Sequence, residues 1–128
     1  MRLLLDTHIV LSVIAGRLSV DHPDVELLLL QEGALGVVSI ASIWEIGIKN
    51  RIGKLDLPMP LEEIGHYLAS MGINLLAIKL AHVIAEVSPQ PPTRDPFDRL
   101  LLAQCSVEKM KLVTLDRSLV SHPLSATR

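Results

Sequence analysis

Short aliphatic segments alternate with helical patterns along this chain, and the alternation constrains the fold more than any other feature. Four segments are typical of buried strands: residues 2–5, 35–39, 73–78 and 111–114. The stretches between them carry apolar residues at helical spacing. Strands joined by helices form parallel sheets that are covered on both faces. We therefore expect an α/β fold, a three-layer α/β/α sandwich with a mainly parallel sheet.

Capping signals place the helices between these strands. Acidic residues precede or open several helical patterns, and glycines follow their ends. The last residues of the chain predict a turn and a short edge strand over 119–128. Helices are expected over residues 8–14, 25–32, the segment from Ser39 or Ser42 to Gly53, 61–71, 79–86 and 96–110.

Length and composition bound the class of protein. At 128 residues the chain is expected to form one domain, residues 1–128, with a sizeable core. Its apolar content is 49%, but no apolar run reaches the roughly 18–20 residues of a membrane span. The apolar start is interrupted by Asp6 and His8, unlike a signal peptide, and the single cysteine fits a reducing compartment. We expect a cytoplasmic protein with no membrane partner.

The net charge of −2 excludes a global basic field that would attract nucleic acid. The three aromatic residues, Trp44, Tyr67 and Phe97, are too few and too scattered in the sequence for a base-stacking platform. Contact with nucleic acid would therefore be local, through a metal ion and a small basic rim. The candidates for that rim are Lys49, Arg51, Lys54 and Arg94.

Two carboxylates bracket a proline in the segment that opens the last long helix. Pro96 suits the first helical position, which makes Asp95 the expected N-cap. Asp98 then lies in the first helical turn, where the helix dipole favours a negative charge. Capping alone explains both residues, so the segment gains a functional meaning only if other carboxylates reach the same place.

Three further carboxylates are expected at that place. Asp6 ends the first strand, Asp116 follows the fourth, and Glu45 lies in the helix after the second. Functional groups of an open α/β sheet gather at the C-terminal ends of its strands. Each residue also has a purely structural interpretation: Asp6 and Asp116 as helix or turn caps, and Glu45 as the partner of Lys49 four residues on.

Carboxylates that converge repel one another, and a divalent cation removes that cost. Oxygen ligands favour Mg²⁺ or Mn²⁺ over zinc, which prefers cysteine and histidine. The sequence contains no Cys/His zinc spacing, no G-x-S-x-G, no P-loop and no G-x-G-x-x-G. An acidic metal site is therefore the predicted chemistry.

Four motifs in order resemble the PIN-domain family, in particular its VapC-type toxin ribonucleases. Together the motifs span nearly the whole chain. Four motifs in the family's order are a much more specific signal than any one of them alone. The motifs are Leu-Leu-Leu-Asp-Thr-His at 3–8, Val-Ser-Ile-Ala-Ser-Ile-Trp-Glu-Ile at 38–46, Arg-Asp-Pro-Phe-Asp-Arg-Leu-Leu-Leu-Ala-Gln at 94–104 and Leu-Val-Thr-Leu-Asp at 112–116.

The resemblance implies strand order 3-2-1-4-5, Mg²⁺- or Mn²⁺-dependent RNA cleavage, a homodimer and inhibition by a cognate VapB-like antitoxin. It assigns catalysis to Asp6, Glu45, Asp98 and Asp116, with Asp6, Asp98 and Asp116 holding the metal and Asp95 as an accessory. Thr7 and Thr114 are expected to orient carboxylates or bound water. Arg94 and Arg99 are expected either to hold phosphate or to pair with acids, and pairing is favoured for Arg99.

Three departures from the family pattern leave these carboxylates in place. Thr93 stands where many relatives have histidine, Ser12 where a tryptophan is frequent, and Leu119 and His122 where aromatics are frequent. Two other classes remain open. One is a receiver-like signalling domain with an acidic magnesium pocket, and the other is a catalytically silent PIN-like binding module.

Overall fold

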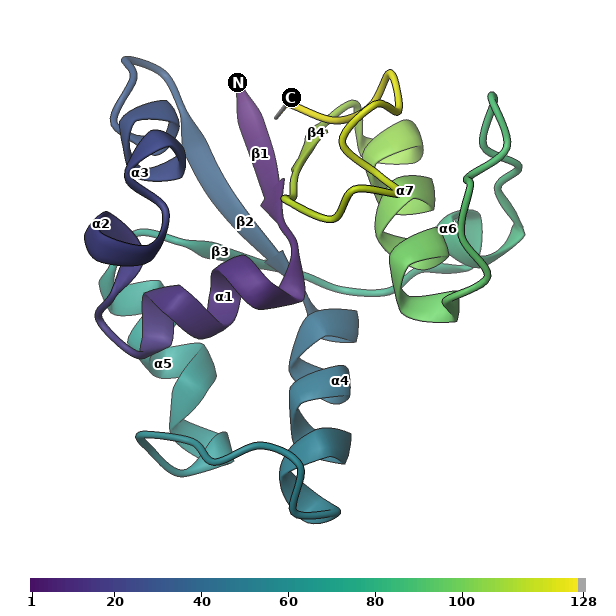
Figure 1. The fold of residues 1–128 in the computed structure, drawn as a ribbon. Helices are drawn as coiled ribbons and strands as arrows, with labels where there is room; N and C mark the ends of the chain where they lie inside the picture. Colours follow the sequence, from purple (N-terminus) through teal and green to yellow (C-terminus); the bar gives the residue numbers. More distant parts are fainter. Residues whose placement is uncertain (127–128) are drawn as a thin grey trace.

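The computed structural model describes residues 1–126, in which helices cover both faces of a parallel sheet (Figure 1). The expected α/β/α architecture is confirmed. In chain order the elements are β1 (Arg2–Leu5), α1 (Thr7–Ile14), α2 (Leu18–Asp21), α3 (Pro23–Leu29), β2 (Leu35–Ser39), α4 (Ile40–Arg51), the 3₁₀ helix η1 (Leu61–Glu63), α5 (Ile64–Ser70), β3 (Asn74–Leu76), α6 (Leu80–Ile84), α7 (Pro96–Glu108) and β4 (Lys111–Val113).

The sheet has the order β3-β2-β1-β4, and every neighbouring pair is parallel. This agrees with the first four positions of the expected order. Within residues 1–126 the expected fifth strand is only a bridge between Leu112 and Ser125. Leu112 bonds the backbone on both sides of Ser125, but Pro123 has no N–H with which to extend the pairing. Residues 127–128 of the predicted edge segment lie outside the described part.

The two faces of the sheet form two separate cores, because successive strand residues point to opposite sides. Leu3 and Leu5 of β1 pack with α1, α3 and α5, whereas Leu4 packs with α7. All three leucines are fully buried. Each burial of this kind contributes about 2 kcal/mol to the stability of the fold. The sheet is thereby fixed from both sides, and its C-terminal edge has a defined geometry.

The observed helices differ from the expected ones in two places. The short helix α2 was not predicted, because its four residues contain no buried side chain that would give a periodic pattern. The segment expected as one helix over 61–71 begins with η1 and continues as α5. Strand β2 and the start of α4 match the prediction, and Ser39 caps α4 by accepting a hydrogen bond from the backbone N–H of Ala41.

Helix α6 is fixed to α7 by a buried polar contact. The ring nitrogen Nδ1 of His82 accepts from the backbone N–H of Lys79, and Nε2 lies 2.7 Å from a Glu108 carboxylate oxygen. His82 is 1% exposed. Three other residues of α6, Leu80, Val83 and Ile84, are exposed apolar side chains. None of the helices within residues 1–126 is long and apolar enough to cross a membrane.

Candidate functional site

The C-terminal ends of two neighbouring strands, β1 and β4, bring Asp6 and Thr114 together. Asp6 caps α1 by accepting a hydrogen bond from the backbone N–H of His8 at 3.1 Å. Its other carboxylate oxygen accepts a hydrogen bond from the hydroxyl of Thr114. Asp6 is 5% exposed and Thr114 is fully buried. Both oxygens of Asp6 are therefore oriented by donors from the end of β4 and the start of α1.

Asp98 lies in the first turn of α7, behind the cap formed by Asp95. Asp95 accepts from the backbone N–H groups of Phe97 and Asp98 at 2.8 and 3.4 Å, which confirms its expected role as N-cap. Burial and the charges of four neighbouring carboxylates together raise the pKa of Asp98 to about 7. Burial has the largest effect, and the neighbours follow in the order Asp95, Asp6, Asp116 and Glu45.

Glu45 on α4 has a partner for each carboxylate oxygen. The hydroxyl of Thr7 donates to Oε1 at 2.7 Å, and Nζ of Lys49 donates to Oε2 at 2.9 Å. The expected ion pair with Lys49 is therefore present. It does not remove Glu45 from the acidic cluster, because Glu45 still acts electrostatically on Asp98. Thr7 thus connects the start of α1 to α4.

Asp116 follows β4 in a tight turn. Its Oδ1 accepts from the backbone N–H of Ser118 at 2.8 Å and from the Ser118 hydroxyl at 2.7 Å. These bonds lower the pKa of Asp116, and the nearby His8 lowers it further. Asp116 is consequently a fixed carboxylate that is ionised at neutral pH. Ser118 was not predicted, because its contact depends on the turn geometry.

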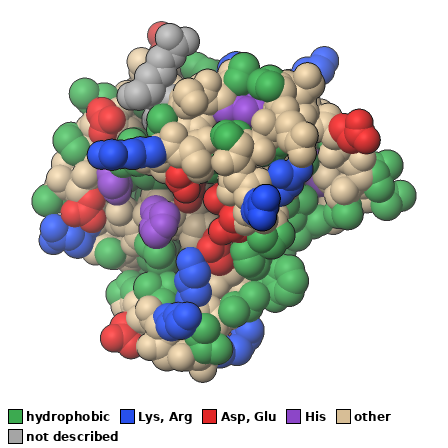
Figure 2. Space-filling view, turned by 45° about the vertical axis from the view of Figure 1, so that its right-hand side comes forward, with side chains coloured by type: hydrophobic (Ala, Val, Ile, Leu, Met, Phe, Trp, Pro, Cys, Tyr) green, Lys and Arg blue, Asp and Glu red, His purple; other side chains and the backbone are tan. Residues whose placement is uncertain are grey.

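The four predicted carboxylates therefore lie at one edge of the sheet, where they influence one another. Figure 2 shows acidic side chains gathered in the middle of one face, with basic and hydrophobic side chains around them. Within residues 1–126, no three carboxylate, histidine or cysteine side chains are placed to hold an ion together directly. The donor set is made of oxygen atoms that repel one another. This chemistry fits Mg²⁺ or Mn²⁺, and Mg²⁺ takes one or two protein carboxylates and retains several waters.

A groove of about 480 Å³ adjoins this cluster on the side of α1. Asp6 and Asp116 line it together with His8, Ser12 and His22. Ser12 and His22 were not predicted as site residues. Their positions follow from the packing of α2 and α3 beside α1, which no local sequence pattern encodes.

Two aromatic rings also meet beside the carboxylates. The centroids of Trp44 and Phe97 are 5.6 Å apart, and the rings are edge-to-face with an interplanar angle of 68°. Two of the aromatic residues that are scattered in the sequence are therefore in contact in the fold. They are 53 positions apart in the sequence, and the packing of α4 against α7 brings them together.

The predicted basic residues differ in their contacts and in their exposure to solvent. Arg99 forms no ion pair with a carboxylate within the described chain, contrary to expectation. Its guanidinium instead donates to the backbone carbonyl of Thr93 at 2.8 Å, which closes the turn before α7. Arg51, Lys54 and Arg94 are exposed, whereas Lys49 is partly covered.

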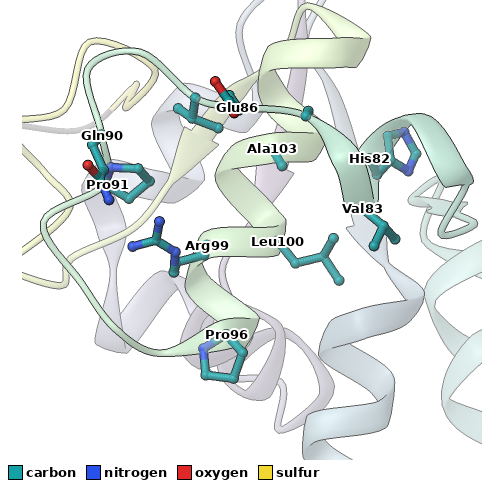
Figure 3. A pocket seen from close by; sticks show the side chains of 11 residues that line it. His82, Val83, Glu86, Gln90, Pro91, Pro96, Arg99, Leu100 and Ala103 are labelled. Carbon is teal, nitrogen blue, oxygen red and sulfur yellow. The ribbon is translucent and has the colours of Figure 1, made fainter.

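Arg99 also lines a second groove, of about 750 Å³, between α6, the following loop and α7 (Figure 3). In this view Arg99 and Leu100 of α7 lie opposite Val83 of α6 and Gln90 of the loop. None of the four predicted catalytic carboxylates lines this groove. Arg99 therefore belongs to a surface separate from the acidic cluster.

Comparisons with known proteins agree with this geometry. The family model described as the PIN domain matches residues 3–122. The fold is similar to that in a crystal structure of VapBC2 from Rickettsia felis bound to a DNA fragment from their promoter, with a TM-score of 0.64. That likeness covers 100% of this chain and 98% of the other at 16% identity, so it concerns the fold. Comparison with curated proteins finds none that matches.

Proposed function

Because this chain belongs to the PIN domain family, we propose that it is a metal-dependent endoribonuclease that hydrolyses RNA phosphodiester bonds, the toxin of a toxin–antitoxin pair. The observation that supports this best is the convergence of Asp6, Glu45, Asp98 and Asp116 at one edge of the sheet. Together with burial, their mutual repulsion raises the pKa of Asp98 to about 7. Such a cluster is costly in an isolated fold and favourable around a divalent cation.

Asp6, Asp98 and Asp116 are the residues that would hold Mg²⁺ or Mn²⁺, with at least one of them bound through water, since the described side chains are not placed to hold an ion as a set of three. A bound ion polarises a phosphoryl oxygen and lowers the pKa of a water ligand. Glu45 is assigned to orient or deprotonate the attacking water. Thr7 and Lys49 hold its carboxylate in place, so the group is oriented before substrate binds. His8 lies near enough to Asp116 to favour its ionised form.

The partners follow from the same family. We assign a cognate VapB-like antitoxin to this chain, since the similar structure from Rickettsia felis is of VapBC2, and we assign a homodimer on the family resemblance alone. The chain also has apolar surface for protein contacts. On α6, Leu80 is 75% exposed and Ile84 is 69% exposed. Exposed apolar groups that lie close together are typical of interaction surfaces.

The hydroxyl of Thr114 provides a first test of the metal site. Thr114→Val keeps the side-chain shape but removes the donor to Asp6. Removal of such orienting groups typically costs 10–100-fold in metal affinity or activity. We expect the Mg²⁺ concentration for half-maximal cleavage to rise by about that factor. Thr114→Ser retains a hydroxyl and should stay close to wild type. An unchanged Mg²⁺ requirement in Thr114→Val would show that this bond does not orient Asp6 for metal binding.

The basic rim gives a second test. Arg51 and Lys54 are exposed at the end of α4, whereas Lys49 is engaged with Glu45. Replacing Arg51 and Lys54 by serine should therefore reduce the salt dependence of RNA binding without disturbing Glu45. The slope of log Kd against log salt should fall by roughly 0.7 for each phosphate that the variant no longer neutralises. Lys109→Asn, at a left-handed position that asparagine tolerates, is the control for loss of one surface positive charge away from α4. Equal slopes in all three proteins would place the rim elsewhere.

The proposed function itself is tested by RNA cleavage with and without Mg²⁺, using Asp6→Asn as the matched variant. Asparagine still caps a helix well, so α1 should persist. Absence of metal-dependent cleavage by the wild-type protein would instead favour the catalytically silent binding module.

A further inference from the structure

The indole of Trp44 is an exposed aromatic surface at the flank of the acidic cluster. It belongs to the only tryptophan of the chain, and it is 58% exposed. Trp44 directly precedes Glu45 on α4, and Phe97 directly precedes Asp98 on α7. The two carboxylates interact electrostatically while the two rings are in edge-to-face contact. The aromatic pair therefore lies beside the proposed reacting centre.

The contact with Phe97 orients Trp44 without covering it. Phe97 is half-buried and packs against the core of α7 and the sheet, so it is a fixed neighbour for the indole. More than half of the Trp44 surface remains open to solvent. A single edge-to-face contact occupies at most one face of an aromatic ring, so it leaves a face available for another planar group.

The negative charge of the site makes an uncharged contact with a nucleic-acid strand important for affinity. The chain has a net charge of −2, and four carboxylates repel the phosphates of an approaching strand. Lys49, the basic residue closest in sequence to Glu45, is engaged in an ion pair with it. Phosphate contacts are therefore left to the exposed rim residues Arg51, Lys54 and Arg94, and base stacking on aromatic rings is an independent source of affinity for single strands.

On the basis of the proposed RNA cleavage, we propose that an unpaired base of the substrate stacks on the exposed face of Trp44. Trp44 is then a positioning residue that selects single-stranded over double-stranded RNA, because paired bases in a duplex do not offer a free face. Stacking tolerates every base, since each has a π-face, so this contact selects strandedness and not sequence.

A second copy of this chain is the competing occupant of Trp44. The most exposed large apolar side chain of the described residues, Leu80, lies on α6, and Ile84 of the same helix is also more exposed than Trp44. Trp44 is distinguished from them by its place beside the carboxylates of Glu45 and Asp98. We therefore assign Trp44 to the substrate, and the test includes protein dilution without RNA.

The single tryptophan permits a direct measurement. In Asp98→Asn protein, which should bind without cleaving, single-stranded oligoadenylate should quench the Trp44 fluorescence, and the same sequence in a duplex should not. Kd for labelled oligoadenylate, measured by anisotropy, should rise about 5- to 100-fold in Trp44→Leu, which keeps apolar bulk without an aromatic face. Trp44→Phe should restore most of the affinity. Leu30→Ala removes a side chain that is 72% exposed outside both grooves, and it should bind like its parent.

Cleavage kinetics separate this inference from the proposed function. With an active site otherwise intact, Trp44→Leu should raise KM while kcat stays near the wild-type value. Equal Kd and KM in Trp44→Leu and wild type, or no quenching by oligoadenylate, would overturn the role of Trp44 while leaving cleavage in place. A fluorescence change on dilution without RNA would assign the indole to a second copy and also overturn it. Absence of metal-dependent RNA cleavage by the wild-type protein would overturn the proposed function, and with it the stacking role.

Discussion

Asp98→Asn should reduce metal-dependent RNA cleavage by about 100-fold or more while keeping its fold. Asp98 is the residue on which burial and the charges of Asp95, Asp6, Asp116 and Glu45 act together. Replacing it by a neutral amide removes one proposed metal ligand and also removes the repulsion. The variant should therefore be at least as stable as wild type in metal-free buffer above pH 7. Initial cleavage rates and thermal unfolding, measured on the same samples, check both statements.

Asp95→Asn is the matched control for this variant. It removes a carboxylate from the same turn, but asparagine is as good an N-cap as aspartate, so the start of α7 should be retained. We expect Asp95→Asn to keep substantial activity, because Asp95 is occupied by the backbone N–H groups of Phe97 and Asp98. Wild-type cleavage by Asp98→Asn, or lower stability of that variant without metal, would contradict the assignment.

Metal-free protein should become less stable as the pH rises from about 4 to about 7. The carboxyl of Asp98 has a pKa of about 7 in the fold, against about 3.9 in an unfolded chain. Between these values the folded state keeps a proton that the unfolded state has released. The free energy of unfolding must therefore fall with increasing pH and level off above about 7. Unfolding midpoints across this range, with wild type and Asp98→Asn in parallel, measure the contribution, which should be absent from the variant.

Added Mg²⁺ or Mn²⁺ should reverse that destabilisation. A ligand that binds only the folded state stabilises it by mass action, and an ion competes with the proton for the Asp98 carboxylate. The gain in Tm should therefore be larger at pH 8 than at pH 5, and it should be small in Asp98→Asn. The Tm of chelator-treated, metal-free protein is the reference from which each gain is measured. An equal gain at both pH values would show that the ions bind away from Asp98.

The layers could be predicted from the sequence because they depend on local patterns, whereas the strand order was expected only from the resemblance to the PIN-domain family. The run of leucines ending at Asp6, for example, is typical of a strand buried on both faces, as β1 is. Helix α2 and the shortening of the fifth strand to a single bridge could not be predicted in the same way. The first has no buried face, and the second depends on how residues 122–126 lie against Leu112.

The carboxylates were predictable because their positions relative to strand ends and caps are fixed by the chain itself. Their surroundings were not. The contact between Thr7 and Glu45 joins residues 38 positions apart, and that between Thr114 and Asp6 joins residues 108 positions apart. The pairing of Trp44 with Phe97 likewise depends on how α4 and α7 pack. Only the assembled fold shows these partners.

The structural interpretations of the acidic residues also prove compatible with a functional one. Asp6 does cap α1, and Glu45 does pair with Lys49. In both cases one local partner holds the carboxylate in place while the group remains within electrostatic reach of Asp98. A cap or an ion pair is thus a device that positions the charge, and its presence does not argue against a metal site.

The central claim is that these carboxylates form a divalent-metal site that cleaves RNA. The most direct measurement is the initial rate of cleavage of single-stranded RNA by wild-type and Asp6→Asn protein, each with Mg²⁺ and with chelator. The account predicts cleavage only by the wild-type protein with Mg²⁺, and similar unfolding midpoints for both proteins in chelator. Cleavage by wild type in chelator, or equal cleavage by folded Asp6→Asn with Mg²⁺, would contradict it.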